Sequence, residues 1–239
     1  MTSTRIDPCA APDGDHFDAT IVLPESGTGP GVLLFQEIFG VNEFIVAKAH
    51  DLAARGYVVA CPDVFWRIER GIALPHDESA LEQAFGYMGR YSGEVDDETK
   101  VGDLVAALAH VRALPEVTGK AGVMGWCLGG LLSYLVAAFG EPDACVSYYG
   151  STIAHRLDLA PQITCPIEFH FGDNDPYIPM TEVDAIRDAF ADRADAEVHV
   201  HAGAGHAFEN LFAPQFANPD AAAQSWPMTT AFLERTLQP

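Results

Sequence analysis

Short apolar runs of strand length alternate along this chain with longer runs whose apolar residues recur at helical spacing. This alternation is typical of a mostly parallel sheet covered by helices on both faces, because each parallel crossover needs a helix of about this size. With 239 residues, the chain is long enough to bury one substantial core. We therefore predict an α/β fold and a single domain over residues 1–239.

The expected elements follow from these runs and from their turn signals. Strands are expected at 20–23, 31–36, 57–61, 121–124, 144–149, 167–171 and 198–201. Helices are expected at 43–55, 98–112, 128–139, 180–190 and 219–236. Residues 62–97 place aromatic side chains among charged ones without one clean period, so we expect a partly helical insertion that covers the sheet's carboxyl edge as a lid.

A Gly-Trp-Cys-Leu-Gly motif lies between an expected strand and an expected helix. A side chain at the apex of a tight strand-to-helix turn needs small neighbours two residues away on each side, and Gly125 and Gly129 meet that need. The turn also directs the first N–H groups of the helix toward Cys127, where they would stabilise a thiolate. The motif indicates a nucleophile elbow. By itself it is equally compatible with a small buried cysteine in a glycine-rich turn.

A sulfur nucleophile needs a base and a group that holds the base, and candidates for both follow later in the chain. Asp175 comes just past an expected strand, where open α/β sheets place functional groups, although Asn-Asp-Pro sequences also form turns. Asp173 is a rival for the same role. His206 lies on a glycine-rich loop after the last expected strand. The order of nucleophile, acid and histidine favours a catalytic triad of Cys127, Asp175 and His206.

A further piece follows the first long apolar strand, where Gln36 to Asn42 read Gln-Glu-Ile-Phe-Gly-Val-Asn. The backbone N–H of Ile38 could join that of Leu128 to bind the oxyanion of a tetrahedral intermediate. Glu37 is unusual in this place, because a carboxylate opposes the negative charge that develops there.

These motifs together resemble the dienelactone hydrolase (carboxymethylenebutenolidase) family over nearly the whole chain. The resemblance implies an α/β-hydrolase fold and an acyl-enzyme mechanism in which Cys127, His206 and Asp175 hydrolyse esters or enol-lactones, without a cofactor or a metal ion. It also implies that Glu37 holds the resting thiol in its neutral form until substrate binding disturbs the carboxylate. A gated thiol would resist oxidation.

The chain departs from the family where the substrate is recognised. Members that act on dienelactones bind the substrate carboxylate with two arginines, but Asn210 stands at one position and no arginine stands at the other, near 79–81. A family tyrosine is replaced by Phe85. The expected pocket residues are Trp126, Phe39, Phe85, Phe208 and Asn210. We expect a neutral or differently shaped ester or lactone as substrate.

The net charge and the cysteines indicate which binding partners and which cellular compartment to expect. The net charge of −21 argues against binding to nucleic acid or an anionic membrane. The five cysteines are widely spaced and mostly lie in apolar runs, which indicates reduced thiols. No membrane span or signal peptide is evident. We expect a cytoplasmic monomer or homodimer whose partner is a small molecule.

Other functions are compatible with parts of the sequence. A metal site could use His199, His201 and His206 with Asp173, since two histidines two residues apart on a strand share a face. The fold could also serve as a non-catalytic binding module. A redox function is disfavoured because no Cys-x-x-Cys pair is present.

Overall fold

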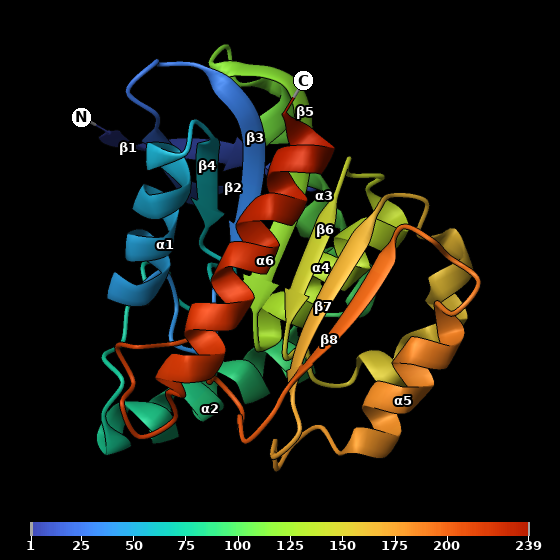
Figure 1. Ribbon diagram of the computed structural model, residues 1–239. Coiled ribbons are helices and arrows are strands. Elements are labelled where there is room, and N and C mark those ends of the chain that lie inside the picture. The colour runs from blue at the N-terminus through green and yellow to red at the C-terminus, as the bar shows by residue number, and fades with distance from the viewer. Residues whose placement is uncertain (1, 239) are drawn as a thin grey trace.

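The computed structural model describes residues 2–238, in which eight strands form one sheet (Figure 1). The strands are β1 (Ser3–Ala10), β2 (His16–Leu23), β3 (Gly29–Phe35), β4 (Val58–Pro62), β5 (Val117–Trp126), β6 (Cys145–Tyr148), β7 (Ile167–Gly172) and β8 (Ala196–His201). Their order in the sheet is β1-β2-β4-β3-β5-β6-β7-β8. β1, β2 and β4 pair antiparallel, and the pairs from β4 to β8 are parallel. The predicted fold class is confirmed.

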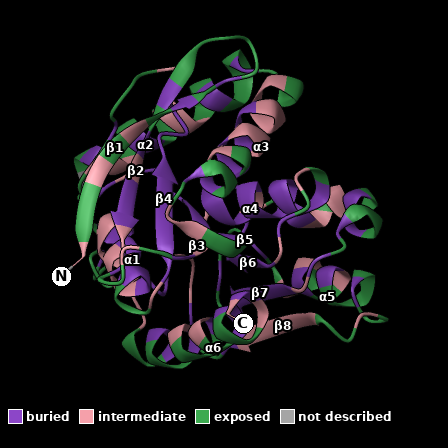
Figure 2. Ribbon diagram, turned by 90° about the horizontal axis from the view of Figure 1, so that it is seen from above, coloured by how far each residue is buried: buried purple, intermediate pink, exposed green. Residues whose placement is uncertain are grey.

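Helices cover both faces of this sheet. They are α1 (Glu43–Ala54), α2 (Glu78–Glu94), α3 (Asp97–Ala113), α4 (Leu128–Phe139), the 3₁₀ segment η1 (Ile153–Gln162), α5 (Met180–Ala189) and α6 (Pro219–Leu237). α1 and α6 lie on one face, and α3, α4 and α5 lie on the other (Figures 1 and 2). The central strands are buried between these layers, as the continuous purple of β4 in Figure 2 shows. None of the described helices combines the length and the apolar character that crossing a membrane requires.

Four of the helices begin at a residue whose side chain caps the first turn. The capping oxygen accepts a hydrogen bond from the backbone N–H three residues later in each case, at Asn42, Asp77, Asp96 and Asn218. α4 is different, because Cys127 stands at its N-cap and makes no capping hydrogen bond through its side chain. The first backbone N–H groups of α4 are therefore not capped by the Cys127 side chain, and they can bind a negatively charged group.

The expected strands and helices are all present, with ends that differ by a few residues, but the sequence did not predict three elements. β1 was missed because Cys9 is its only buried residue, so its apolar signal is weak. α2 was expected only as part of an irregular insertion, because Gly86, Gly89 and Gly93 interrupt its pattern. η1 was missed as well, and it contains Pro161.

Candidate functional site

Cys127 occupies the apex of the turn between β5 and α4. Its φ of 55° and ψ of −117° are strained for a residue with a side chain. A Cβ atom on Gly125 would lie 2.5 Å from the carbonyl oxygen of Gly129, and one on Gly129 would lie 2.6 Å from the carbonyl oxygens of Phe35 and Gln36. The backbones on either side of the apex therefore approach as closely as only glycine allows. Cys127 is half-buried, whereas the other four cysteines are buried.

His206 and Asp175 meet through a hydrogen bond of 2.8 Å between Nδ1 and Oδ2. The other carboxylate oxygen, Oδ1, accepts hydrogen bonds from the backbone N–H groups of Tyr177 (2.8 Å) and Ile178 (3.2 Å). Asp175 thus closes the turn after β7 with one oxygen and binds the imidazole with the other. Its rival Asp173 instead accepts a hydrogen bond from the N–H of Gly203 at 2.7 Å.

The electrostatics of His206 link it to Cys127 as well as to Asp175. Burial lowers the pKa of His206, but attraction to the Cys127 thiolate and hydrogen bonds to Asp175 and Cys127 outweigh burial and raise that pKa to about 10. Once Cys127 has ionised, the imidazole keeps its proton at neutral pH. Such an ion pair supplies a nucleophile and an acid in neighbouring positions.

Cys127 and His206 open into a cavity of about 290 Å³ at the carboxyl edge of the sheet. The cavity is lined by Glu37, Ile38, Phe39, Leu81, Phe85, Met88, Cys127, Ser151, Thr152, Tyr177, His206, Ala207 and Phe216. These residues come from α2 and from segments that follow β3, β5, β6, β7 and β8. Most of the wall is apolar, and among the described residues no lysine or arginine lines it.

Two of the five expected pocket residues line this cavity, namely Phe39 and Phe85. The prediction was wrong for Trp126, Phe208 and Asn210, whose side chains are fully buried outside the lining. Trp126 ends β5 and packs among aromatic rings of the core, and Phe208 does the same after the loop of His206. Asn210 lies behind the cavity wall.

Glu37 forms part of the wall that Cys127 faces. Its carboxylate is almost completely buried, and Oε2 accepts a hydrogen bond from the Nδ2 of Asn210 at 2.7 Å. Oε1 is also buried and has no hydrogen-bond partner among the described residues. An unpartnered carboxylate oxygen therefore belongs to the residue that lines the cavity beside the thiol.

His76, which the sequence did not single out, completes the support of Glu37. Phe212 N–H donates to the Oδ1 of Asn210, and Ile45 N–H donates to the Oδ1 of Asn42. These contacts orient both amides so that their Nδ2 groups lie 2.9 and 3.1 Å from the Nε2 of His76. His76 Nε2 therefore faces both amide donors and lies 3.6 Å from the Oε2 of Glu37. No sequence motif marks this histidine.

A second buried carboxyl group, Glu209, lies in the same region of the core. Burial raises its pKa to about 7, although the nearby Lys48 ammonium, with which it forms an ion pair, opposes that rise. The negative charge of Glu37 adds to the increase. The wall behind the cavity thus holds two acidic side chains, each with its own hydrogen-bonding partner.

The metal site considered from the sequence does not form. The rings of His199 and His201 do share a face, but the Nε2 of His201 lies 2.9 Å from the Nδ1 of the buried His170. His206 is bound to Asp175, and Asp173 accepts from a backbone N–H. The proposed ligands therefore have separate partners.

Comparison with known proteins adds to this geometry. The "Dienelactone hydrolase family" profile matches residues 17–237. The chain is 38% identical over 197 residues to a carboxymethylenebutenolidase of Pseudomonas putida. This alignment covers 82% of each of the two chains. It is 34% identical over 226 residues to carboxymethylenebutenolidase 1 of Cupriavidus pinatubonensis, with 94% of this chain and 91% of that one covered. The crystal structure of a putative dienelactone hydrolase from Klebsiella pneumoniae superposes with a TM-score of 0.77 at 25% identity and covers 96% of this chain and 98% of its own.

Proposed function

Because the chain belongs to the dienelactone hydrolase family and is a hydrolase of lactones or esters, we propose that Cys127, His206 and Asp175 are its catalytic triad. One observation carries this proposal: His206 is hydrogen-bonded to Asp175 at 2.8 Å and opens, together with Cys127, into one apolar cavity. In an activated nucleophile of this kind a third group orients the base, and the hydrogen bond between Asp175 and His206 supports that role for Asp175.

In the proposed mechanism, the Cys127 thiolate attacks the carbonyl carbon of the ester or lactone. A tetrahedral intermediate forms, and its collapse breaks the bond to the leaving oxygen, which takes a proton from the His206 imidazolium. The neutral imidazole then accepts a proton from water as the water oxygen attacks the thioester. Collapse of the second intermediate releases the carboxylic acid and returns the thiolate and the imidazolium.

The oxyanion is proposed to bind the backbone N–H groups of Ile38 and Leu128. Ile38 lines the cavity, and Leu128 is the first residue of α4, whose N–H has no partner within the helix. Leu128 directly follows Cys127 in the chain. Loss of one such donor typically costs about 3 kcal/mol of transition-state stabilisation.

Glu37 is proposed to keep the resting thiol neutral. Its Oε1 lacks a partner and can accept a hydrogen bond from the Cys127 S–H, while Asn210 holds Oε2 in place. A substrate in the cavity would lie beside this carboxylate, since Glu37 and Cys127 line the same space. Displacement of the carboxylate would then allow the proton to leave and the thiolate to pair with His206.

Replacement of Glu37 by alanine is expected to make Cys127 react with iodoacetamide roughly 10-fold faster at neutral pH. The change removes a negative charge that opposes ionisation of the thiol, and a tenfold increase in thiolate corresponds to one pH unit. The rate is measured by mass spectrometry of the Cys127 peptide. Glu94→Ala, which removes an exposed carboxylate, serves as the control and should react like the wild type. An unchanged rate in Glu37→Ala would refute the gating.

The apolar wall supports a neutral ester or lactone as the preferred substrate. A carboxylate buried in a cavity without a cationic side chain loses its hydration and gains no charge-assisted hydrogen bond. The position at which dienelactone-cleaving relatives are expected to hold an arginine is Asn210, which here is turned toward Glu37. Asparagine in place of arginine at this position removes a cation from the site and gives the carboxylate of Glu37 an amide as its hydrogen-bond partner.

A matched pair of lactones tests this preference. We expect kcat/KM for a lactone that carries a carboxamide to exceed that for the same lactone with a free carboxylate by roughly 10- to 100-fold, the value of one charged hydrogen bond. Leu81→Arg places a cation in the cavity wall and should narrow the difference. Equal rates on both lactones, or a preference for the acid, would contradict the assignment.

We further propose that residues 1–239 form a single domain in which α2 acts as a lid. Leu81, Phe85 and Met88 lie on one face of α2 at helical spacing and line the cavity. The cytoplasm remains the proposed location, which the five free cysteines support.

A further inference from the structure

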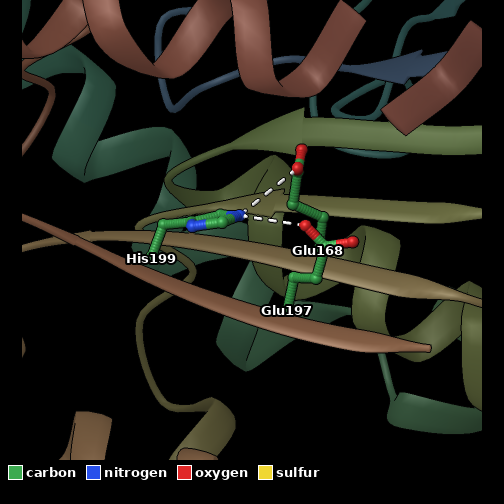
Figure 3. A group of neighbouring side chains, drawn as sticks. All are labelled: Glu168, Glu197 and His199. Carbon is green, nitrogen blue, oxygen red and sulfur yellow. Dashed lines mark ion pairs between the residues drawn. The ribbon is translucent and has the colours of Figure 1, made fainter. Parts of the chain in front are cut away.

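We infer that the β7–β8 edge of the sheet carries a site for one divalent transition-metal cation, with Glu168, Glu197 and His199 as ligands. Figure 3 shows these three side chains converging from the two neighbouring strands. None of them lines the cavity that contains Cys127 and His206. The site is thus separate from the proposed catalytic triad.

The register of the two strands brings the ligands together. Glu168 of β7 pairs with Glu197 of β8, and His170 pairs with His199 two residues later on each strand. Residues two apart on a strand point to the same face, so both carboxylates and His199 share one face. Two carboxylates placed directly opposite each other repel, which favours a cation between them.

One of the two carboxylate oxygens of Glu168 lacks a hydrogen-bond partner among the described residues. Its side chain is fully buried, and Oε2 accepts a hydrogen bond of 2.8 Å from Thr229 and lies 3.0 Å from the Nε2 of His170. Oε1 is buried and has no hydrogen-bond partner among the described residues. A buried carboxylate oxygen without a partner is costly, and a cation would remove that cost.

The distances between the three ligand atoms suit a metal better than a hydrogen bond. The Nε2 of His199 lies 3.5 Å from the Oε1 of Glu168 and 3.4 Å from the Oε2 of Glu197, and all three atoms lie within 4.8 Å of one another. Good N–H···O hydrogen bonds are about 2.7–3.2 Å long. Ligands around tetrahedral zinc with bonds of about 2.0 Å are separated by about 3.3 Å.

α6 anchors the second oxygen of each carboxylate. Thr229 holds the Oε2 of Glu168, and Arg235 forms an ion pair with the Oε1 of Glu197. Partners of this kind fix the orientation of metal ligands and leave the other oxygen for the metal. His199 and Glu197 are partly exposed, so water can enter and supply a fourth ligand.

The chemistry of the ligands selects the type of cation. One imidazole nitrogen with two carboxylate oxygens suits zinc or a similar first-row ion, whereas calcium and magnesium prefer shells of oxygen alone. The cation would be structural. β7 leads into the turn of Asp175, and β8 leads into the loop of His206. A metal between these strands would therefore cross-link the two strands from which Asp175 and His206 extend.

Zinc binding is tested with the full chain in a Cys127→Ala background, because a reactive thiol also binds zinc. After treatment with a chelator and addition of zinc, we expect one zinc ion per chain after gel filtration, measured by mass spectrometry of the metal. At a free zinc concentration of 100 times the Kd, Tm should rise by roughly 5 to 10 °C.

Three variants decide the assignment. His199→Gln and Glu197→Gln should each abolish stoichiometric zinc and the rise in Tm. Both variants change partly exposed side chains, so we expect the chain to fold. His155→Gln removes an exposed histidine that forms an ion pair with Glu182, and this variant should retain both effects. Absence of bound zinc in the parent protein would overturn the proposal. So would equal zinc binding in His199→Gln, whatever the fate of the hydrolase activity.

Discussion

Replacement of Cys127 by alanine is expected to lower kcat/KM for aryl esters and neutral lactones by roughly 10⁴- to 10⁶-fold. The thiolate is the proposed attacking atom, and no other described cysteine lines the cavity. With alanine, the remaining oxyanion donors and the pocket can still accelerate attack by water, so the activity should not fall to the uncatalysed rate. Steady-state kinetics with both substrate types measure the loss.

A buried cysteine provides the matched control for this experiment. Burial raises the pKa of Cys165 to about 11, so this side chain is an inert thiol outside the cavity. Cys165→Ala should keep kcat/KM within a small factor of the wild type. Cys127→Ser keeps a nucleophilic atom at the apex, and its activity should lie between those of Cys127→Ala and the wild type. Undiminished turnover in Cys127→Ala would remove Cys127 from the mechanism.

Replacement of Asp175 by asparagine is expected to lower kcat roughly 10³- to 10⁴-fold without unfolding the turn. The N–H groups of Tyr177 and Ile178 donate to Oδ1, and an asparagine Oδ1 can accept both bonds. The amide Nδ2 must then face the Nδ1 of His206. Two donors cannot share that contact, so His206 would adopt the wrong tautomer to serve as base. Kinetics and the far-UV circular dichroism spectrum measure activity and folding together.

Asp173 offers a close comparison for that variant. It lies two residues earlier in the same turn, and its carboxylate accepts from a backbone N–H instead of an imidazole. Asp173→Asn should therefore keep nearly full activity. If Asp173→Asn lost as much activity as Asp175→Asn, the effect would arise from the turn and the role of Asp175 in orienting His206 would be withdrawn.

The residues proposed for the reaction could be predicted from the sequence because each one is marked by its immediate neighbours. Cys127 is identified by glycines two residues away, Asp175 by the turn that ends a strand, and His206 by a glycine-rich loop. Close backbone packing and tight turns leave a local sequence signal. Their mutual placement then follows from the fold.

The walls of the cavity could be predicted only in part, through Phe39 and Phe85. Trp126 and Phe208 adjoin catalytic candidates in sequence, yet both side chains pack into the core. His76 lies in the insertion before α2 and contacts Asn210 across 134 positions of sequence. Which neighbour of a loop residue faces a cavity depends on tertiary packing, and that packing is not visible in periodicity or composition.

The proposed cation site could not be predicted from the sequence, because its ligands come from two different strands. Glu168 and Glu197 become neighbours only when the register between β7 and β8 is known. A shift of one residue would send the side chains of one strand to the opposite face. The spacing of His199 and His201 on one strand predicted their shared face, but the sequence grouped His199 with His201, His206 and Asp173 rather than with the two glutamates.

The close approach of Gly125 and Gly129 means that backbone atoms, rather than the side chain at the apex, set the position of the proposed nucleophile. The apex can therefore accept either sulfur or oxygen without rebuilding its surroundings. Codons for cysteine and serine differ by a single base, so lineages with this turn can exchange one nucleophile for the other in one mutational step. The gating proposed for the neighbouring acid, Glu37, would suit a thiol and would have no comparable use beside a hydroxyl.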